Sequence, residues 1–317
     1  MSVCSHLPTV CSGDYPSISL ALDERLVSGT MPSELGALTV VDLNLRLNVL
    51  SGTVPAALWQ LTSLTNNLQL WENRISGTIA TEVSRLSRLK GLYLEVNSLS
   101  GTIPTELALL SSSLTHNLGL CCNCGRHWEM PCEPNAAGGV SGTIPTEFGY
   151  LSKIGYLSGE RDLDLGLNRL SGTVPTELGQ LTHATNLWMQ QNRLSGTMPT
   201  ELHALSKLQV LALEGNLFSG TIPPLTSLRL LTYCSLNSLA APVCPAVGQR
   251  LPPACYDHVL PEGCSTPPKA SVVPYVRERV LSPVVQAMLT LAVVVAVVRW
   301  LVRWFRRRDS GGSGALV

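Results

Sequence analysis

The stretch NSLSGTIPTEL, residues 97–107, decides the fold, because related copies of it return along most of the chain. Each copy has a glycine at the same place, and these glycines are Gly29, Gly52, Gly77, Gly101, Gly142, Gly172, Gly196 and Gly220. Neighbouring copies lie about 24 residues apart, except for two longer steps after Gly101 and Gly142. A period of this size predicts a solenoid in which every copy builds one coil.

One unit shows how a coil is expected to fold. Leu92 and Leu94 alternate with Tyr93, which predicts a short strand with the leucines inside and Tyr93 facing solvent. Asn97 is expected to end the strand and to bond backbone groups of the turn through its side-chain amide. Residues 105–107 should begin a short helical or 3₁₀ turn on the outer side. The predicted fold class is an α/β repeat solenoid, a leucine-rich-repeat horseshoe or superhelix with a parallel β-sheet on its concave face.

The composition favours a binding protein. The chain has 22 basic and 22 acidic residues, so its overall charge does not indicate nucleic-acid binding. The six histidines are scattered, and neither a Ser/His/Asp set nor a phosphate-binding glycine loop stands in a suitable context. We therefore expect no enzyme activity, no cofactor and no metal site.

Ten cysteines lie at the edges of the repeats and in one interruption of them. Such clusters suggest disulfides in an oxidising compartment. The disulfide candidates are Cys121, Cys122, Cys124, Cys132, Cys234, Cys244, Cys255 and Cys264. A zinc cluster of the first four with His127 is the alternative for the interruption, although a second well-spaced pair is missing.

The pattern divides the chain into segments. Residues 1–13 form an N-terminal remnant or cap, and 14–233 the repeat array, with a Cys-rich insertion at about 121–139 that is expected to loop out after Asn123. Residues 234–264 form a Cys-containing cap and 265–279 a stalk. The 19 uncharged residues 280–298 are long enough for a transmembrane helix. The arginines of the tail, 299–317, place the C-terminus in the cytoplasm, and 280–308 is expected to contact membrane lipid.

The repeated phrase looks like the plant-type leucine-rich repeat over about 14–230. The order of array, cap, stalk, span and short basic tail resembles plant receptor-like proteins. This resemblance implies a cell-surface protein without a kinase, whose extracellular array binds a protein, peptide or glycan ligand and signals through partners such as a co-receptor. The alternative is a tail-anchored scaffold with the array in the cytosol. Residues 1–13 lack the features of a signal peptide and the chain lacks Asn-x-Ser/Thr sequons, and both facts favour that alternative.

Ligand contacts are expected at the outward strand positions, two and four residues before the asparagine of each unit. Trp71, Tyr93 and Trp188 are predicted to be solvent-facing aromatics, a residue class enriched at interaction hot spots. Arg46, Glu95 and Asp164 add charge to the same face. The alternative interpretation is that all six are ordinary surface residues of a curved sheet.

Overall fold

The computed structural model describes residues 18–21, 27–123, 138–157, 162–236, 244–245 and 251–255, with the backbone alone at 18–21 and 244–245. The chain divides into two units, residues 1–267 and 268–317, and all described residues belong to the first. Among them, no helix has the length and apolar character needed to cross a membrane. The segment 280–298 lies outside the described residues.

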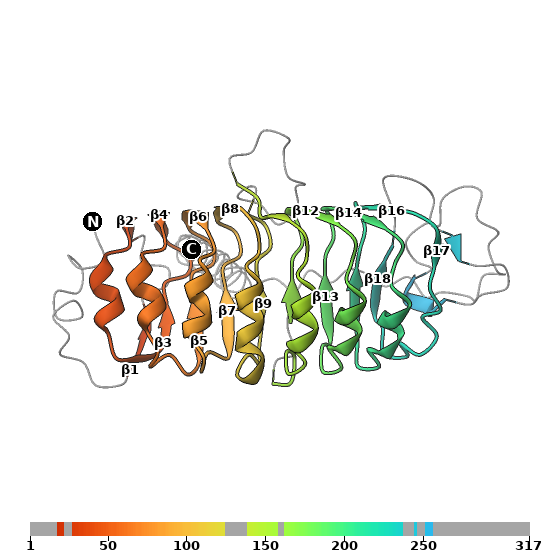
Figure 1. The fold of residues 1–317 in the computed structure, drawn as a ribbon, viewed down its shortest axis with the longest axis horizontal. Coiled ribbons are helices and arrows are strands. Elements are labelled where there is room, and N and C mark those ends of the chain that lie inside the picture. The colour runs from red at the N-terminus through yellow and green to blue at the C-terminus, as the bar shows by residue number, and fades with distance from the viewer. Residues whose placement is uncertain are drawn as a thin grey trace, which may run out of the picture. The chain divides into compact units, whose positions relative to one another are not determined.

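One parallel sheet runs the length of the array (Figure 1). We call it the long sheet. Its nine strands follow the order of the chain, one from each coil. They are β1 (Ile18–Ala21), β3 (Val40–Asn44), β5 (Asn67–Gln69), β7 (Gly91–Tyr93), β9 (Leu118–Gly119), β11 (Leu163–Asp164), β13 (Asn186–Trp188), β15 (Val210–Ala212) and β18 (Tyr233–Ser235). The predicted alternation is confirmed, because Leu92 and Leu94 are buried while Tyr93 is partly exposed.

The Ser-Gly-Thr segments form a second set of parallel strands, which was not predicted. These strands are β2 (Ser28–Thr30), β4 (Val49–Thr53), β6 (Arg74–Thr78), β8 (Ser98–Ser100), β10 (Ser141–Gly142), β12 (Arg169–Gly172), β14 (Arg193–Gly196) and β16 (Leu217–Phe218). They pair in two groups of four, and a bridge between Thr102 and Ser141 joins the groups. At Gly101, φ is 76°, and a Cβ would lie 2.7 Å from the Thr78 Cγ2. Glycine is therefore required there both by backbone conformation and by the neighbouring coil.

Short 3₁₀ helices cover the opposite side of the core (Figure 1). They are η1 (Ser33–Ala37), η2 (Ala56–Gln60), η3 (Thr81–Arg85), η4 (Thr105–Ser112), η5 (Thr146–Tyr150), η6 (Thr176–Gln180) and η7 (Thr200–Ala204). Most of them begin directly after a proline, whose fixed φ ends the preceding strand. Between the helices and the long sheet lies one continuous core made largely of leucine.

A ladder of buried asparagines holds successive coils in register. The Asn97 Nδ2 donates to the carbonyl oxygens of Leu70, Leu94 and Glu95 at 3.0, 3.2 and 3.2 Å, and its Oδ1 accepts from the Ile75 N–H at 3.0 Å. Corresponding positions are held by Asn48, Asn73, Asn123, Asn168, Asn192 and Asn216. The predicted role of this residue is confirmed, with the addition that each side chain also bonds the coil before it.

The array ends in a small cap. Cys234 in β18 forms a disulfide with Cys255 in η8 (Pro253–Cys255). Near it, β17 (Thr221–Ile222) pairs with β19 (Cys244–Pro245). Leu251 and Cys255 belong to the same buried core as the leucines of the coils. The cap therefore covers apolar surface that the last coil would expose.

Candidate ligand-binding face

The side of the long sheet that faces away from the leucine core carries the predicted contact residues. We call it the outer face. Residues four before each ladder asparagine form one column across it, and residues two before form a second. The register places Tyr93 beside Gln69 and Gly119, and Asp164 beside Gly119 and Trp188. Equivalent side chains of successive coils thus stand next to one another, about 4.8 Å apart along the array.

Two pairs of side chains mark the two halves of the outer face. In the N-terminal half, the Arg46 guanidinium carbon lies 5.3 Å from the centroid of the Trp71 ring. In the C-terminal half, the rings of Trp188 and Tyr233 stack at 5.7 Å with an interplanar angle of 28°. Both tryptophans are partly exposed. Each pair offers a preorganised aromatic surface, because its neighbour restricts the movement of the indole.

Acidic side chains occupy the centre between these pairs. Glu95 and Asp164 flank Cys121 on neighbouring coils. Burial raises the pKa of the Cys121 thiol well above its usual range, and a hydrogen bond with Cys122 and the charges of Asp164 and Glu95 raise it further. The effect of both carboxylates on one thiol indicates a negative potential at the centre of the outer face. Glycines in the same two columns, Gly119 and Gly166, leave space there for neighbouring side chains.

Two of the predicted contact residues are buried, which corrects the expectation that they face solvent. Glu95 is 5% and Asp164 1% exposed. The Glu95 carboxylate lies directly over Gly119, in the space that a side chain would fill. The Asp164 Oδ1 accepts a hydrogen bond from the Gly166 N–H at 3.2 Å. The missing side chain of Gly119 on the next coil allows the Glu95 carboxylate to fold onto the sheet, and Asp164 has the same glycine beside it on the preceding coil.

The cysteine predictions have mixed outcomes. The prediction that Cys234 and Cys255 take part in disulfides is confirmed, and the structure pairs them with each other. The prediction for Cys121 and Cys122 is wrong, because both are buried free thiols. With Val96 and Leu167 they form a small apolar cluster apart from the main core, so they pack as small hydrophobic residues. Only the strand is described at Cys244, and Cys124, His127, Cys132 and Cys264 lie outside the described residues. Within the described part, no group of three or more His, Cys, Asp or Glu could hold a metal ion.

A third column, six residues before each asparagine, was missed by sequence reasoning. It includes Asp42 and Asp162, whose side chains bond the neighbouring coil, and Asn67, whose Oδ1 lies 3.2 Å from the Nδ1 of His116 two coils further on. The Asp162 Oδ2, for example, accepts from the Thr185 Oγ1 at 2.8 Å and from the Asn186 N–H at 3.1 Å. Tyr233 stands in this column, since it pairs with Val210. It was missed because Cys234 replaces the leucine that would have marked the strand.

Three plant receptor structures resemble this chain. A TDR receptor has 25% sequence identity and a TM-score of 0.60 over 75% of this chain and 42% of that one. The Arabidopsis receptor kinase HAESA, in complex with the peptide hormone IDA and the co-receptor SERK1, has 29% identity and a TM-score of 0.58 over 70% of this chain and 33% of that one. The plant peptide hormone receptor RGFR1, in complex with RGF2, has 31% identity and a TM-score of 0.52 over 67% of this chain and 31% of that one. This chain therefore spans less than half the length of each.

No protein-family model and no curated protein matches the sequence. The repeat phrase, the fold and the similarity to these receptors together define the class: the chain is a plant-type leucine-rich-repeat protein.

Proposed function

We propose that this protein is a membrane-anchored recognition module that binds a peptide on the outer face of the long sheet and acts through a partner protein. Structures similar to it contain peptide hormones, and one also contains a co-receptor. The similar structures are receptors, which act by binding, and the columns of the outer face offer contact surface. The observation that carries the proposal is the pair of aromatic anchors on either side of an acidic centre.

The spacing of the anchors defines the ligand we expect. Trp71 follows β5 and Trp188 ends β13, which are four strand steps apart in the long sheet. At about 4.8 Å a step, the anchors are roughly 19 Å apart. An extended peptide covers this distance with about six residues. The ligand is therefore a peptide with an apolar or aromatic residue near each end of such a segment and a Lys or Arg between them, attracted by the charges of Glu95 and Asp164.

The location is also part of the proposal. The uncharged run 280–298, followed by five arginines within 299–308, fits a single span with a cytoplasmic tail. The Cys234–Cys255 disulfide supports an array on the oxidising side of that membrane. Protease treatment of sealed vesicles tests this orientation. We expect right-side-out vesicles to lose the array and to protect only the tail; protection of the array would instead favour a cytosolic scaffold.

Binding can be tested without knowing the natural ligand. The full chain, purified in a mild detergent, is used to select from a phage library of random peptides, and the affinity of a selected peptide is measured by interferometry. Replacing both Trp71 and Trp188 with alanine should weaken binding about tenfold or more, with little change in melting temperature. Tyr156→Ala is the matched control, because this exposed aromatic follows η5 and stands before the strand of its coil, outside the columns of the outer face. Unchanged affinity in the double variant would refute the proposed site.

A further inference from the structure

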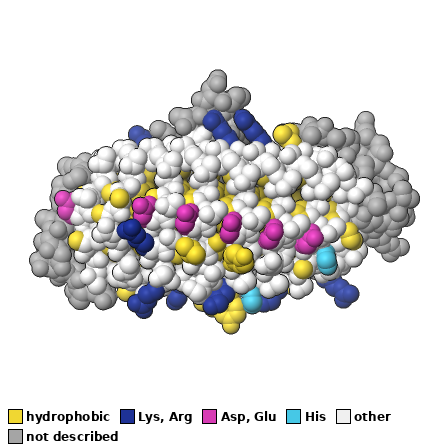
Figure 2. All heavy atoms as spheres, in the orientation of Figure 1, with side chains coloured by type: hydrophobic (Ala, Val, Ile, Leu, Met, Phe, Trp, Pro, Cys, Tyr) yellow, Lys and Arg dark blue, Asp and Glu magenta, His cyan; other side chains and the backbone are white. Residues whose placement is uncertain are grey.

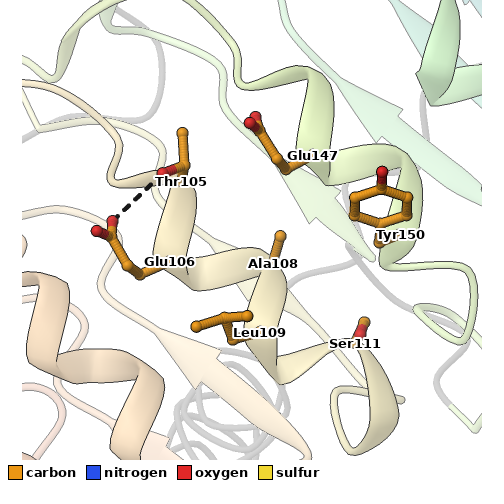
Figure 3. Close-up of a pocket in the computed structure, with 7 residues that line it drawn as sticks. All are labelled: Thr105, Glu106, Ala108, Leu109, Ser111, Glu147 and Tyr150. Carbon is orange, nitrogen blue, oxygen red and sulfur yellow. Dashed lines mark hydrogen bonds between the residues drawn. The ribbon is translucent and has the colours of Figure 1, made fainter.

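A hollow interrupts the helical side of the array between η4 and η5. Its volume is about 350 Å³, and it is lined by Thr105, Glu106, Ala108, Leu109, Ser111, Glu147 and Tyr150 (Figure 3). Leu109 and Tyr150 are each 66% exposed, and both line the hollow. They occupy equivalent positions in two successive coils and face solvent from either side of the hollow. The centre of the helical side therefore carries apolar surface that nothing in the described coil covers.

Charged residues run in columns on both sides of this apolar centre. A 3₁₀ helix has 3.0 residues per turn, so Glu147 and Tyr150 lie on one face of η5, and Lys153 follows in the turn beyond it. The acidic column contains Glu82, Glu106, Glu147, Glu177 and Glu201, and Figure 2 shows acidic side chains in one line across this side, with hydrophobic side chains below its middle. Six residues after Glu82, Glu147 and Glu201 stand exposed basic residues, Arg88, Lys153 and Lys207.

Around the hollow, this order of acidic, apolar and basic positions is complementary to itself; the middle column is not apolar along its whole length, because Arg85 holds the equivalent position in η3. If a two-fold axis ran along the middle column, Leu109 and Tyr150 would meet the same residues of a second copy. The acidic column of each copy would then face the basic column of the other, with Glu147 opposite Lys153 twice over. An isologous contact needs such a match, because the same patch is used by both subunits.

We propose that the helical side is a homodimer interface in which two arrays lie parallel, with the hollow between η4 and η5 at its centre. The buried Leu109 and Tyr150 supply most of the affinity, since ion pairs at a solvent-exposed rim contribute little. The charge columns fix the parallel arrangement and disfavour the antiparallel one, in which glutamate would face glutamate. The outer face of the long sheet stays on the opposite side of each coil, so dimerisation leaves both ligand faces accessible.

Sedimentation equilibrium of the full chain in a density-matched mild detergent tests the proposal. We expect a monomer–dimer equilibrium whose dissociation constant rises about tenfold or more in the variant with Leu109→Ser and Tyr150→Ser. Glu147→Lys alone and Lys153→Glu alone should each weaken the dimer by about tenfold, because each places like charges opposite one another twice. The variant carrying both charge changes should recover the original dissociation constant to within about twofold.

Glu34→Lys is the matched control. It reverses a similar exposed glutamate in η1, but the residue six positions later is the buried Val40, so no facing cation is lost. Circular dichroism melting shows whether each variant is folded. A monomer at all concentrations overturns the proposal. A dimer whose dissociation constant is unchanged by the four substitutions also overturns it, because the contact would then lie elsewhere in the chain. Additive weakening in the double charge variant overturns it as well.

Discussion

The side-chain oxygen of Asn168 accepts a hydrogen bond from the backbone N–H of Val140 at 3.0 Å, and the Asn168 Nδ2 donates to the Leu120 carbonyl at 2.8 Å. Asn168 and Leu120 are 48 residues apart. The asparagine ladder therefore passes the longest irregular step of the chain without a break. Since Asn123 also keeps its ladder bond to Leu99, the extra residues leave and rejoin the coil without changing its register.

Asn168→Ala should lower the free energy of unfolding by about 1–3 kcal/mol, because it leaves the Val140 N–H buried without its partner, while the Leu120 carbonyl keeps the bond from the Asn123 Nδ2 at 2.7 Å. Urea denaturation followed by circular dichroism measures the change. Asn66→Ala is the control, because this asparagine stands outside the ladder and is only partly buried; its effect should stay within about 0.5 kcal/mol. Equal losses in both variants would contradict a special role for the ladder.

The residue before each ladder asparagine has a left-handed backbone. At Leu47, φ is 55°, and at the equivalent Gly215 it is 71°. This conformation destabilises leucine by about 1–2 kcal/mol, which is more than the backbone entropy that glycine would lose on folding. We expect Leu47→Gly to raise the free energy of unfolding by about 0.5 kcal/mol and Leu47→Val to lower it, because valine is β-branched. The opposite order in thermal melts would show that side-chain packing, not backbone strain, decides this position.

Because of the Cys121 thiol, we expect the free energy of unfolding to fall at alkaline pH. Its pKa is raised in the folded protein, chiefly by burial, so the folded state holds this proton more tightly than the unfolded state does. The stabilisation is complete below the unfolded pKa of about 8.5 and is lost as pH rises above it towards the folded pKa. Urea titrations at about pH 7.5 and about pH 9.5 should show a smaller loss of stability in Cys121→Ala than in the unmodified chain. Identical losses would contradict this assignment.

Reduction should loosen the C-terminal end first. The Cys234–Cys255 bond closes a loop with a sequence separation of 21, and a bond of this loop size contributes about 3 kcal/mol. Replacing both cysteines with alanine should speed hydrogen exchange in β15 and β18 and leave β5 and β7 almost unchanged, because each coil contacts only its neighbours. Mass-spectrometric exchange measures this gradient; equal acceleration in all strands would mean that the array unfolds as one unit.

Sequence predicted the features that repeat, because the same physical requirement acts on every coil. Leu92, Tyr93 and Leu94 alternate as expected, and Asn97 bonds the turn as expected. The second strand set was missed, since Gly101 suggested only a bend where the Ser-Gly-Thr segments in fact pair between coils. A single sequence position also does not reveal its neighbour in the next coil.

That limit explains the errors at the candidate site. Glu95 is buried because its carboxylate lies over Gly119, the residue of the next coil that pairs with Tyr93, and this placement depends on register across the sheet. Cys121 and Cys122 were expected in disulfides because cysteines cluster around them, yet both pack as apolar side chains. The stacking of Trp188 with Tyr233 follows from the fold of the last coil, whose repeat pattern is degraded.

The close approach of Gly138 to Asn123 has a practical consequence. Gly138 lies directly beside the Asn123 carbonyl, with no room for a Cβ, so the segment between them begins and ends at one point of the solenoid. This position is therefore suited to insertions. We expect a tag, a fluorescent reporter or a binding loop inserted between these two residues to leave the register of the coils unchanged.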